Sequence, residues 1–231
     1  MAGEPEITVN VFAWNEVETT TRTLDEIRDV LVGMKVDFEI IFIDDGSTDG
    51  TSEAADEYAA KDPRVRVVHH GENKGVGPVY RTGFTEARGR FMTFFPADGQ
   101  FPAEIIAKFH PLMDGKDMVL GYIPHRKGSI VGPILSRLER VLYRLFFGPI
   151  PRFQGILMFR RALLDGMNLR SEGRGWAVLM EFIMRATRAK VRMVSVPTTM
   201  RERTAGVSKV NNFANIKANL QQVIKLRGLM D

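Results

Sequence analysis

Short apolar runs alternate with longer amphipathic segments along the first half of the chain. The short runs are rich in Val, Ile and Phe, as buried strands are, whereas the longer segments repeat apolar residues at helical spacing. We predict strands at residues 7–14, 38–43, 65–69, 91–95 and 118–122. We predict helices at residues 19–32, 51–61, 75–87 and 103–113. This alternation indicates an α/β fold with one open, mainly parallel twisted sheet flanked by helices.

The alternation changes after Tyr122, and we therefore divide the single domain, residues 1–231, into halves of about 1–121 and 122–231. In the second half we predict a short strand at 155–159, a helix at 176–188, a late strand at 191–196 and a mixed helix at 211–229. Residues 133–147 are predicted to form an amphipathic helix, with an apolar stripe on one side and arginines on the other. The stripe suits packing on the domain's own sheet or lying in a bilayer interface, and the sequence favours neither.

The composition is that of a water-soluble protein, with 44% apolar and 26% charged residues among 231. No run approaches the ~20 apolar residues that span a membrane, and no signal segment opens the chain. The absence of cysteine excludes disulfides and thiolate chemistry and fits a reducing compartment. We therefore expect a cytoplasmic protein, with any membrane contact limited to a peripheral one at the cytoplasmic face.

The formal net charge is +4, and the positive excess is concentrated in residues 122–161. Against one acidic residue, Glu139, this stretch holds eight basic ones: Arg126, Lys127, Arg137, Arg140, Arg144, Arg152, Arg160 and Arg161. Such a block suits nucleic acid, an anionic membrane surface or a phosphorylated substrate. Because neither an RNA-binding signature nor a helix-turn-helix pattern accompanies it, we expect no nucleic-acid partner.

Asp98 is the first candidate for chemistry, because it lies in the turn that ends the apolar run 91–95. A buried strand that ends in a tight turn brings polar groups to the carboxyl edge of an open α/β sheet. Asp98, with Gln100 two residues on, suits a Mg²⁺ or Mn²⁺ ion that holds a diphosphate, because hard cations take oxygen ligands. The alternative is a turn residue that binds its own backbone.

The loop after the strand at 38–43 carries two further carboxylates, Asp44 and Asp45. They suit hydrogen bonds from a nucleobase N–H or from ribose hydroxyls. Ser47, Thr48 and Asp49 just before the next predicted helix are equally typical of an ordinary N-cap. The two interpretations of this loop are about even.

Other candidates are weaker. The turn at 73–77 contains Lys74 and two glycines and suits a phosphate, although a turn with a helix cap is the simpler interpretation. Glu181 suits a general base or, as we prefer, a paired carboxylate beneath a site. The segment 201–209, with Arg203 and Lys209, suits an anion better than a solvated basic loop. The four histidines lack metal-ligand spacing and are interpreted as structural or surface residues: His69, His70, His110 and His125.

Taken together, these segments resemble the family 2 glycosyltransferases, and among them the dolichyl-phosphate mannose synthase-like branch, whose acceptors are polyprenyl phosphates. FAWNE at 12–16 is similar to the family's opening Pro-Ala-Tyr-Asn-Glu, and IDDGSTDGT at 43–51 matches almost letter for letter. NKG at 73–75 with RTGF at 81–84 matches the third block, and ADGQ at 97–100 the fourth. Later segments match this branch less specifically: 136–148, 155–161, 180–181 and 203–209.

The resemblance implies a GT-A (Rossmann-like) fold, with the first half binding a nucleoside-diphosphate sugar and the second half the acceptor. Base and ribose would be held by Ala13, Trp14, Glu16 and Asp45, with Asp44 and Lys74 beside them. Asp98 and Gln100, next to Ala97, would face Mg²⁺ or Mn²⁺ and the diphosphate. Donor or acceptor phosphates would meet Arg126, Ser136, Arg203 and Lys209.

In this branch the acceptor is a dolichyl or undecaprenyl phosphate, which is already an anion and attacks the sugar carbon without a strong base. The resemblance therefore implies inversion, with positioning and charge neutralisation as the work of the site. Two alternatives remain open: a soluble hydroxyl acceptor with Glu181 as base, or a catalytically degenerate subunit that binds nucleotide sugars.

This sequence departs from the family pattern at three places. Pro96-Ala97-Asp98 stands where the family has Asp-x-Asp, so that one potential metal ligand is missing. The aspartate that usually precedes Gly155 is absent, and Gly132 stands where an arginine is expected one turn before Ser136. We therefore expect metal binding to rest on Asp98, the diphosphate and water, with Gln100, and to weaken without nucleotide.

Overall fold

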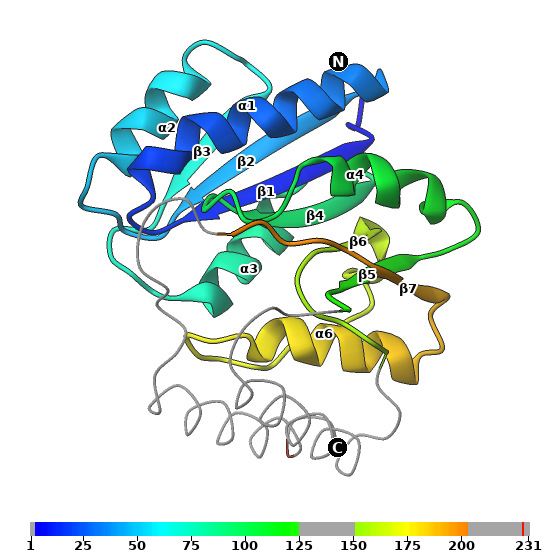
Figure 1. Ribbon diagram of the computed structural model, residues 1–231. Helices are drawn as coiled ribbons and strands as arrows, with labels where there is room; N and C mark the ends of the chain where they lie inside the picture. The colour runs from blue at the N-terminus through cyan, green and yellow to red at the C-terminus, as the bar shows by residue number, and fades with distance from the viewer. Residues whose placement is uncertain (1–2, 125–150, 203–227, 229–231) are drawn as a thin grey trace.

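The computed structural model describes residues 3–124, 151–202 and 228. Seven strands form one sheet in the order β3-β2-β1-β4-β6-β5-β7 (Figure 1). Their bounds are β1 (Ile7–Ala13), β2 (Phe38–Asp44), β3 (Val65–His69), β4 (Phe91–Pro96), β5 (Met118–Tyr122), β6 (Leu157–Arg160) and β7 (Met193–Pro197). Strand β6 runs antiparallel to its neighbours β4 and β5, and the other pairs are parallel. The predicted mainly parallel sheet is confirmed.

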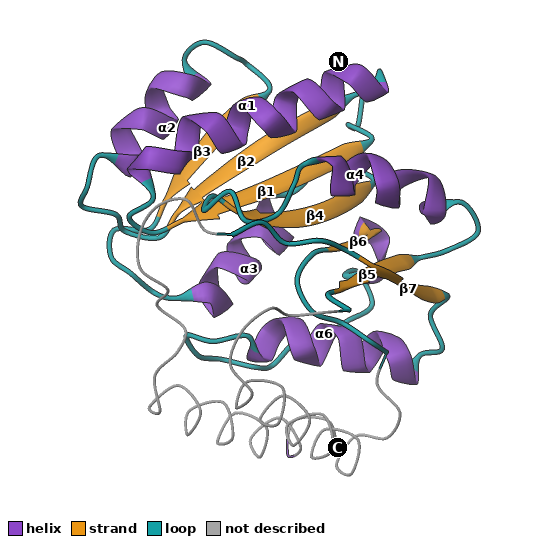
Figure 2. Ribbon diagram, in the orientation of Figure 1, coloured by secondary structure: helices purple, strands orange, loops and turns teal. Residues whose placement is uncertain are grey.

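Helices cover both faces of the sheet (Figure 2). On one face lie α1 (Val17–Met34), α2 (Thr51–Ala59) and α4 (Glu104–Phe109), and on the other lie α3 (Val76–Glu86) and α6 (Ala177–Arg188). Two short 3-10 helices, η1 (His110–Met113) and η2 (Arg161–Leu163), complete the described elements. Since both faces are covered, the central strands β1 and β2 are buried along almost their whole length, and most of their residues are apolar.

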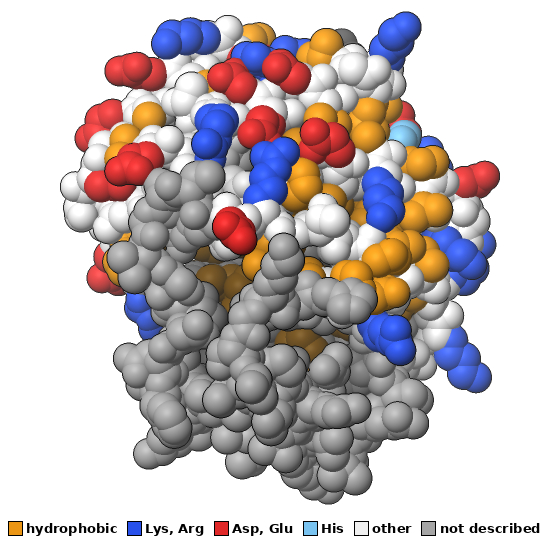
Figure 3. All heavy atoms as spheres, viewed as in Figure 1, with side chains coloured by type: hydrophobic (Ala, Val, Ile, Leu, Met, Phe, Trp, Pro, Cys, Tyr) orange, Lys and Arg blue, Asp and Glu red, His pale blue; other side chains and the backbone are white. Residues whose placement is uncertain are grey.

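Each face of the sheet has its own apolar core. Leu24 of α1 and Ile106 of α4 belong to the first core, and Val79 of α3 and Phe182 of α6 belong to the second. Outside the first core, α1 carries both acidic and basic side chains, whereas the charged side chains of α2 are all acidic; Figure 3 shows red and blue side chains together on this part of the surface. No helix in the described ranges is both long and apolar enough to cross a bilayer.

Most predicted elements agree with the observed ones to within one or two residues, and β3 and β5 agree at both ends. The predicted helix at 103–113 is instead divided into α4 and the 3-10 helix η1. Pro111 explains the division, because it has no N–H for the α-helical ladder. The antiparallel direction of β6 was not anticipated from the sequence.

Gly83 of α3 lies in close contact with side chains of the sheet. A Cβ built at this position lies 2.5 Å from the ring of Phe94 and 2.9 Å from Oδ1 of Asn10, and both residues are buried. We therefore expect Gly83→Ala to lower the free energy of unfolding by about 1–3 kcal/mol, through overpacking. Urea denaturation followed by far-UV circular dichroism measures this change.

Gly33 supplies the matched control, because it also lies in a helix but a Cβ built on it would have nothing within 4 Å. Gly33→Ala is expected to raise the free energy of unfolding by up to about 1 kcal/mol, since alanine loses less entropy in a helix. A Gly83→Ala variant as stable as the parent protein would contradict the close packing of α3 on β4.

Candidate active site at the carboxyl edge of the sheet

The carboxyl ends of β1, β2 and β4 lie side by side. In the register of the sheet, Ala13 pairs with Asp44 and Phe12 pairs with Pro96. The backbone bonding continues past the strands, since Ala97 N donates to Phe12 O at 2.8 Å and Asp45 N donates to Ala13 O at 2.9 Å. The order of strands reverses between β1 and β4, and open α/β sheets bind ligands at such a point. The candidate residues 13, 44, 45, 97 and 98 are thus brought to one edge.

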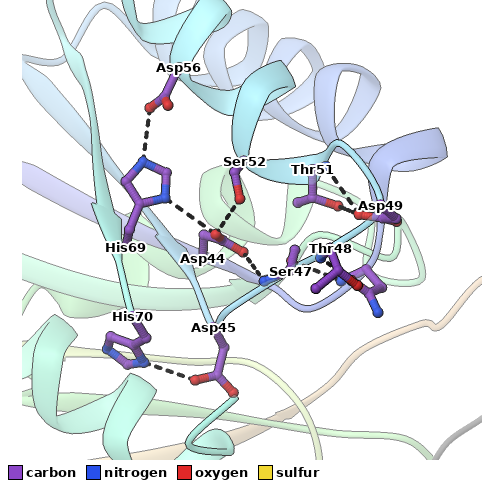
Figure 4. Close-up of polar contacts among 11 residues, drawn as sticks. Asp44, Asp45, Ser47, Thr48, Asp49, Thr51, Ser52, Asp56, His69 and His70 are labelled. Atoms are coloured by element: carbon purple, nitrogen blue, oxygen red, sulfur yellow. Dashed lines mark hydrogen bonds and ion pairs between the residues drawn. The ribbon is translucent and has the colours of Figure 1, made fainter. Parts of the chain in front are cut away.

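Asp44 is buried and holds its own loop together (Figure 4). Its carboxylate accepts hydrogen bonds from Ser47 N at 3.1 Å and from Ser52 Oγ at 2.6 Å, and lies 3.2 Å from Nδ1 of His69. Burial acts to raise the pKa of Asp44, but the bonds from Ser47, Ser52 and His69 outweigh it and hold that pKa below its usual value. The ionised carboxylate of Asp44 therefore holds this loop in place.

The loop before α2 binds the starts of both α1 and α2. Glu16 N donates to Thr51 Oγ1 at 2.9 Å, and Val17 N donates to Asp49 Oδ2 at 3.2 Å. The residue before α2 is Gly50, at φ 95°, which makes no side-chain cap. Asp49 Oδ1 also accepts a hydrogen bond from Thr51 N, the first residue of α2, at 3.1 Å. The capping interpretation therefore holds for Asp49, which binds α1 as well because the parallel neighbours β1 and β2 bring this loop against α1. The negative charge of the Asp49 carboxylate at the N-terminus of α1 also interacts favourably with the helix dipole.

Asp45 is 4% exposed and accepts four hydrogen bonds from a single stretch of chain. Lys74 N lies 3.0 Å from its Oδ1, and Gly75 N lies 2.8 Å from its Oδ2. The other two donors are Nδ1 of His70, at 2.8 Å from Oδ1, and Nδ2 of Asn73, at 3.0 Å from Oδ2. The carboxylate thus ties the end of β2 to the turn before α3.

His70 was missed as part of this site. It is buried, and its Nε2 lies 2.8 Å from Oγ1 of Thr82 on α3. Its carboxylate partner can only accept, so Nδ1 carries the proton. The available signal was its place directly after β3, the neighbour of β2 in the sheet.

The turn after β4 is held from two sides. Asp98 Oδ1 accepts a hydrogen bond from Gln100 N at 3.0 Å, as the turn-residue interpretation expects. From α1, Thr23 Oγ1 donates to Ala97 O at 3.1 Å, and from the segment after β7, Arg201 N donates to Gln100 O at 2.7 Å. In the ranges that the structure describes, no group of three His, Asp or Glu side chains is arranged to hold a metal ion.

Two further candidates, the aromatic Trp14 and the acidic Glu16, follow β1 along the chain. Trp14, directly after β1, is 39% exposed. Glu16 precedes α1 and is half-buried.

Glu181 of α6 is buried, and both of its carboxylate oxygens accept hydrogen bonds. Its Oε1 accepts hydrogen bonds from Arg170 N at 3.0 Å and from Arg185, whose Nη2 lies 2.7 Å away. Its Oε2 accepts one from Ser171 N at 2.7 Å. Burial acts to raise the pKa of Glu181, but the bonds from Ser171, Arg170 and Arg185 outweigh it, so the pKa lies below its usual value. These contacts agree with the paired-carboxylate interpretation.

A family model described as "Glycosyl transferase family 2" matches residues 8–179, which is more than half of the chain. The chain belongs to glycosyl transferase family 2. The matched region includes the whole edge described above, from Ala13 to Asp98, and it extends to α6.

Two curated relatives of this family 2 glycosyltransferase are 30% identical to it. One is a dolichol-phosphate mannosyltransferase of Pyrococcus furiosus, over 88% of this chain and 59% of that protein. The other is a polyprenol monophosphomannose synthase of Mycolicibacterium smegmatis, over 83% of this chain and 78% of that protein. The chain therefore spans less than two thirds of the length of the first relative.

Solved structures confirm the GT-A fold of this family 2 glycosyltransferase. Glucosyl-3-phosphoglycerate synthase from Mycobacterium tuberculosis, solved with phosphoglyceric acid, aligns over 97% of this chain and 80% of its own at a TM-score of 0.72 and 20% identity. A mannosyltransferase from Pyrobaculum calidifontis, solved with GDP-Man and Mn²⁺, aligns over 99% of this chain and 65% of its own at a TM-score of 0.64 and 21% identity.

Some candidates of this family 2 glycosyltransferase lie outside the described residues. They are Arg126, Ser136, Arg203, Lys209, His125, the predicted helix at 133–147 and almost all of the one at 211–229. Among the described candidates, the pairings and bonds given above bring together Ala13, Asp44, Asp45, Lys74 and Ala97, and Asp98 follows Ala97 in the turn after β4.

Proposed function

We propose that this chain is an inverting glycosyltransferase that moves a sugar from a nucleoside-diphosphate sugar to a polyprenyl phosphate, assisted by Mg²⁺ or Mn²⁺. Two relatives at 30% identity over most of this chain carry names of that activity. An undecaprenyl-phosphate mannosyltransferase of Micrococcus luteus, 28% identical over 86% of this chain, adds to this support. The donor site in the proposal is the carboxyl edge at the β1–β4 switch point.

The choice of a phosphate acceptor rests on the burial and the hydrogen bonds of the Glu181 carboxylate. A hydroxyl acceptor needs a base to take its proton, and Glu181 was the candidate for that role. Its carboxylate is 0% exposed, and both oxygens are engaged by Arg170, Ser171 and Arg185. An acceptor that is already an anion, such as a lipid phosphate, needs no such base.

In the proposed reaction, a phosphate oxygen of the acceptor attacks the anomeric carbon while the bond from that carbon to the donor's diphosphate breaks. The new bond forms on the face opposite to the leaving group, so the configuration inverts and a nucleoside diphosphate is released. No proton has to be moved at neutral pH. The site's contribution is to align the two anions and to neutralise their charge.

Asp98 is the proposed protein ligand for the divalent cation, with Gln100 beside it. A single carboxylate suits Mg²⁺ or Mn²⁺ when diphosphate oxygens and water complete the shell. When bound, the cation would stabilise the charge that develops on the leaving diphosphate. The turn fits this role, because α1 and the segment after β7 hold its backbone while the carboxylate stands at the edge.

For the other candidates the proposal keeps the roles implied by the resemblance. Ala13, Trp14, Glu16, Asp44 and Asp45 would shape the site of base and ribose, next to Lys74 and Ala97. Arg126, Ser136, Arg203 and Lys209 would meet phosphates. Since a polyprenyl phosphate resides in a membrane, we propose peripheral contact with the cytoplasmic membrane face through the second half, residues 122–231, and the amphipathic helix that the sequence predicts at 133–147.

The test combines the protein with GDP-mannose or UDP-glucose, Mn²⁺ or Mg²⁺, and undecaprenyl phosphate in detergent. We expect nucleoside diphosphate release that requires both the lipid phosphate and the cation, and a product whose anomeric configuration, read by NMR, is inverted. Release with a soluble hydroxyl acceptor but none with the lipid would contradict the proposal. Donor binding without turnover on any acceptor would favour the degenerate subunit instead.

A further inference from the structure

The chain has two tryptophans, and both are exposed, Trp14 at 39% and Trp176 at 41%. In the ranges that the structure describes, every other Phe or Tyr side chain is buried or half-buried. Trp14 follows β1 at the carboxyl edge, whereas Trp176 directly precedes α6. Since single exposed apolar side chains are common on protein surfaces, the position of Trp176 decides whether its exposure has a function.

The segment before Trp176 is docked on the turn that leads into α3. Gly77 N donates to Arg174 O at 3.2 Å, and the Arg174 side chain contacts Asn73. The approach is close, because a Cβ built on Gly75 would lie 2.5 Å from Arg174 O. The same turn is tied to the end of β2 by the hydrogen bonds described above. The start of α6 is therefore held next to the turn at the carboxyl edge, as Figure 1 shows.

The backbone of this segment is also held from two helices. Arg81 of α3 donates to Leu169 O at 3.2 Å and contacts Ser171 O. From α6, the carboxylate of Glu181 accepts a hydrogen bond from Ser171 N at 2.7 Å. The place of Trp176 is thus set by the chain itself, and a side chain held in this way binds a ligand at a lower entropic cost.

Contacts between aromatic rings connect Trp176 to the end of β1. The ring centroids of Trp176 and Tyr80 lie 5.8 Å apart, and Tyr80 is buried in α3. The centroid of the Tyr80 ring lies 6.1 Å from that of Phe12, in the last turn of the pleat of β1. Phe12 pairs with Pro96 of β4, two residues before Asp98. The exposed indole is therefore two ring contacts away from the strands that flank the switch point.

We propose that Trp176 is a donor-binding residue, whose exposed indole packs against the sugar ring of the nucleoside-diphosphate sugar. This inference rests on the proposed function, which assigns the nucleoside and the diphosphate to the ends of β1, β2 and β4. The sugar is joined to the outer phosphate, so it extends from this edge toward the second half of the chain. One face of a hexose ring presents apolar C–H groups, which suit a flat aromatic ring and leave the hydroxyls free for hydrogen bonds.

The experiment compares ligands that differ only in the sugar. Calorimetry with Mn²⁺ measures Kd for GDP-mannose and GDP, and for UDP-glucose and UDP. For the pair that the parent protein binds, we expect Trp176→Ala to raise the Kd of the nucleotide sugar about tenfold, and to change that of the nucleoside diphosphate less than about twofold. Trp176→Phe keeps an aromatic ring and should recover most of the loss.

Val32→Ala is the matched control, because Val32 is also exposed but lies near the end of α1, ahead of the amino end of β2. It should leave both Kd values unchanged. Unchanged affinity for the nucleotide sugar in Trp176→Ala, an equal loss for both ligands, or a loss confined to the KM of the lipid phosphate would each overturn the inference. If the parent protein binds neither pair, the proposed donor class itself fails, and the inference falls with it.

Discussion

Asp98→Asn is expected to lower kcat/KM for sugar transfer by about 10²- to 10³-fold, the range seen when one group that stabilises developing charge is removed. The asparagine keeps the oxygen that accepts the bond from Gln100 N, so the turn should persist while the negative charge is lost. Release of nucleoside diphosphate with undecaprenyl phosphate and Mn²⁺ measures the rate. Electron paramagnetic resonance of Mn²⁺ with nucleotide measures the loss of cation binding.

Asp114→Asn is the control for this prediction. Asp114 is exposed and ends η1, ahead of the amino end of β5, away from the carboxyl edge. Its substitution should leave turnover and Mn²⁺ binding unchanged. Full turnover of Asp98→Asn would show that another group neutralises the diphosphate, and the assignment of the turn after β4 would then be wrong.

The fold was predictable because its signal is local. Residues 91–95 form an uninterrupted apolar run, and all of them are buried in β4. The position of Asp98 followed from the same run, since a polar residue directly after a buried strand must lie at the sheet edge. Proline at position 111 equally warned of an interrupted helix, although the sequence interpretation kept that segment as one helix.

The partners of the carboxylates were not predictable in the same way. Asp49 binds Val17, 32 residues earlier, and Asp45 binds Gly75, 30 residues later. Such bonds depend on which strands are neighbours, and the order β3-β2-β1-β4 cannot be derived from the periodicity of any one segment. His70 is an example, because it lacks metal-ligand spacing and its role emerged only from the adjacency of β2 and β3.

Glu181→Gln is expected to lower the free energy of unfolding by about 3–5 kcal/mol, because it leaves the Arg185 guanidinium and the N–H donors of Arg170 and Ser171 around a neutral amide. The pKa of Glu181 is lowered in the folded protein, so its ionised form contributes stability above the unfolded pKa of about 4.3, and this contribution is lost as pH falls through the folded pKa. Urea denaturation of both proteins between pH 3 and 8 should therefore show a difference that shrinks at the acid end.

The same variant separates a structural carboxylate from a catalytic base. A paired carboxylate predicts that folded Glu181→Gln retains a rate near that of the parent at 25 °C, whereas a base predicts a large loss of kcat with stability intact. Glu172→Gln is the control on the neighbouring loop, because Glu172 is exposed. Its substitution should change the free energy of unfolding by no more than about 0.5 kcal/mol and should leave kcat unchanged. A stable Glu181→Gln protein that has lost turnover would instead support a soluble hydroxyl acceptor, because only a hydroxyl acceptor must give its proton to a base.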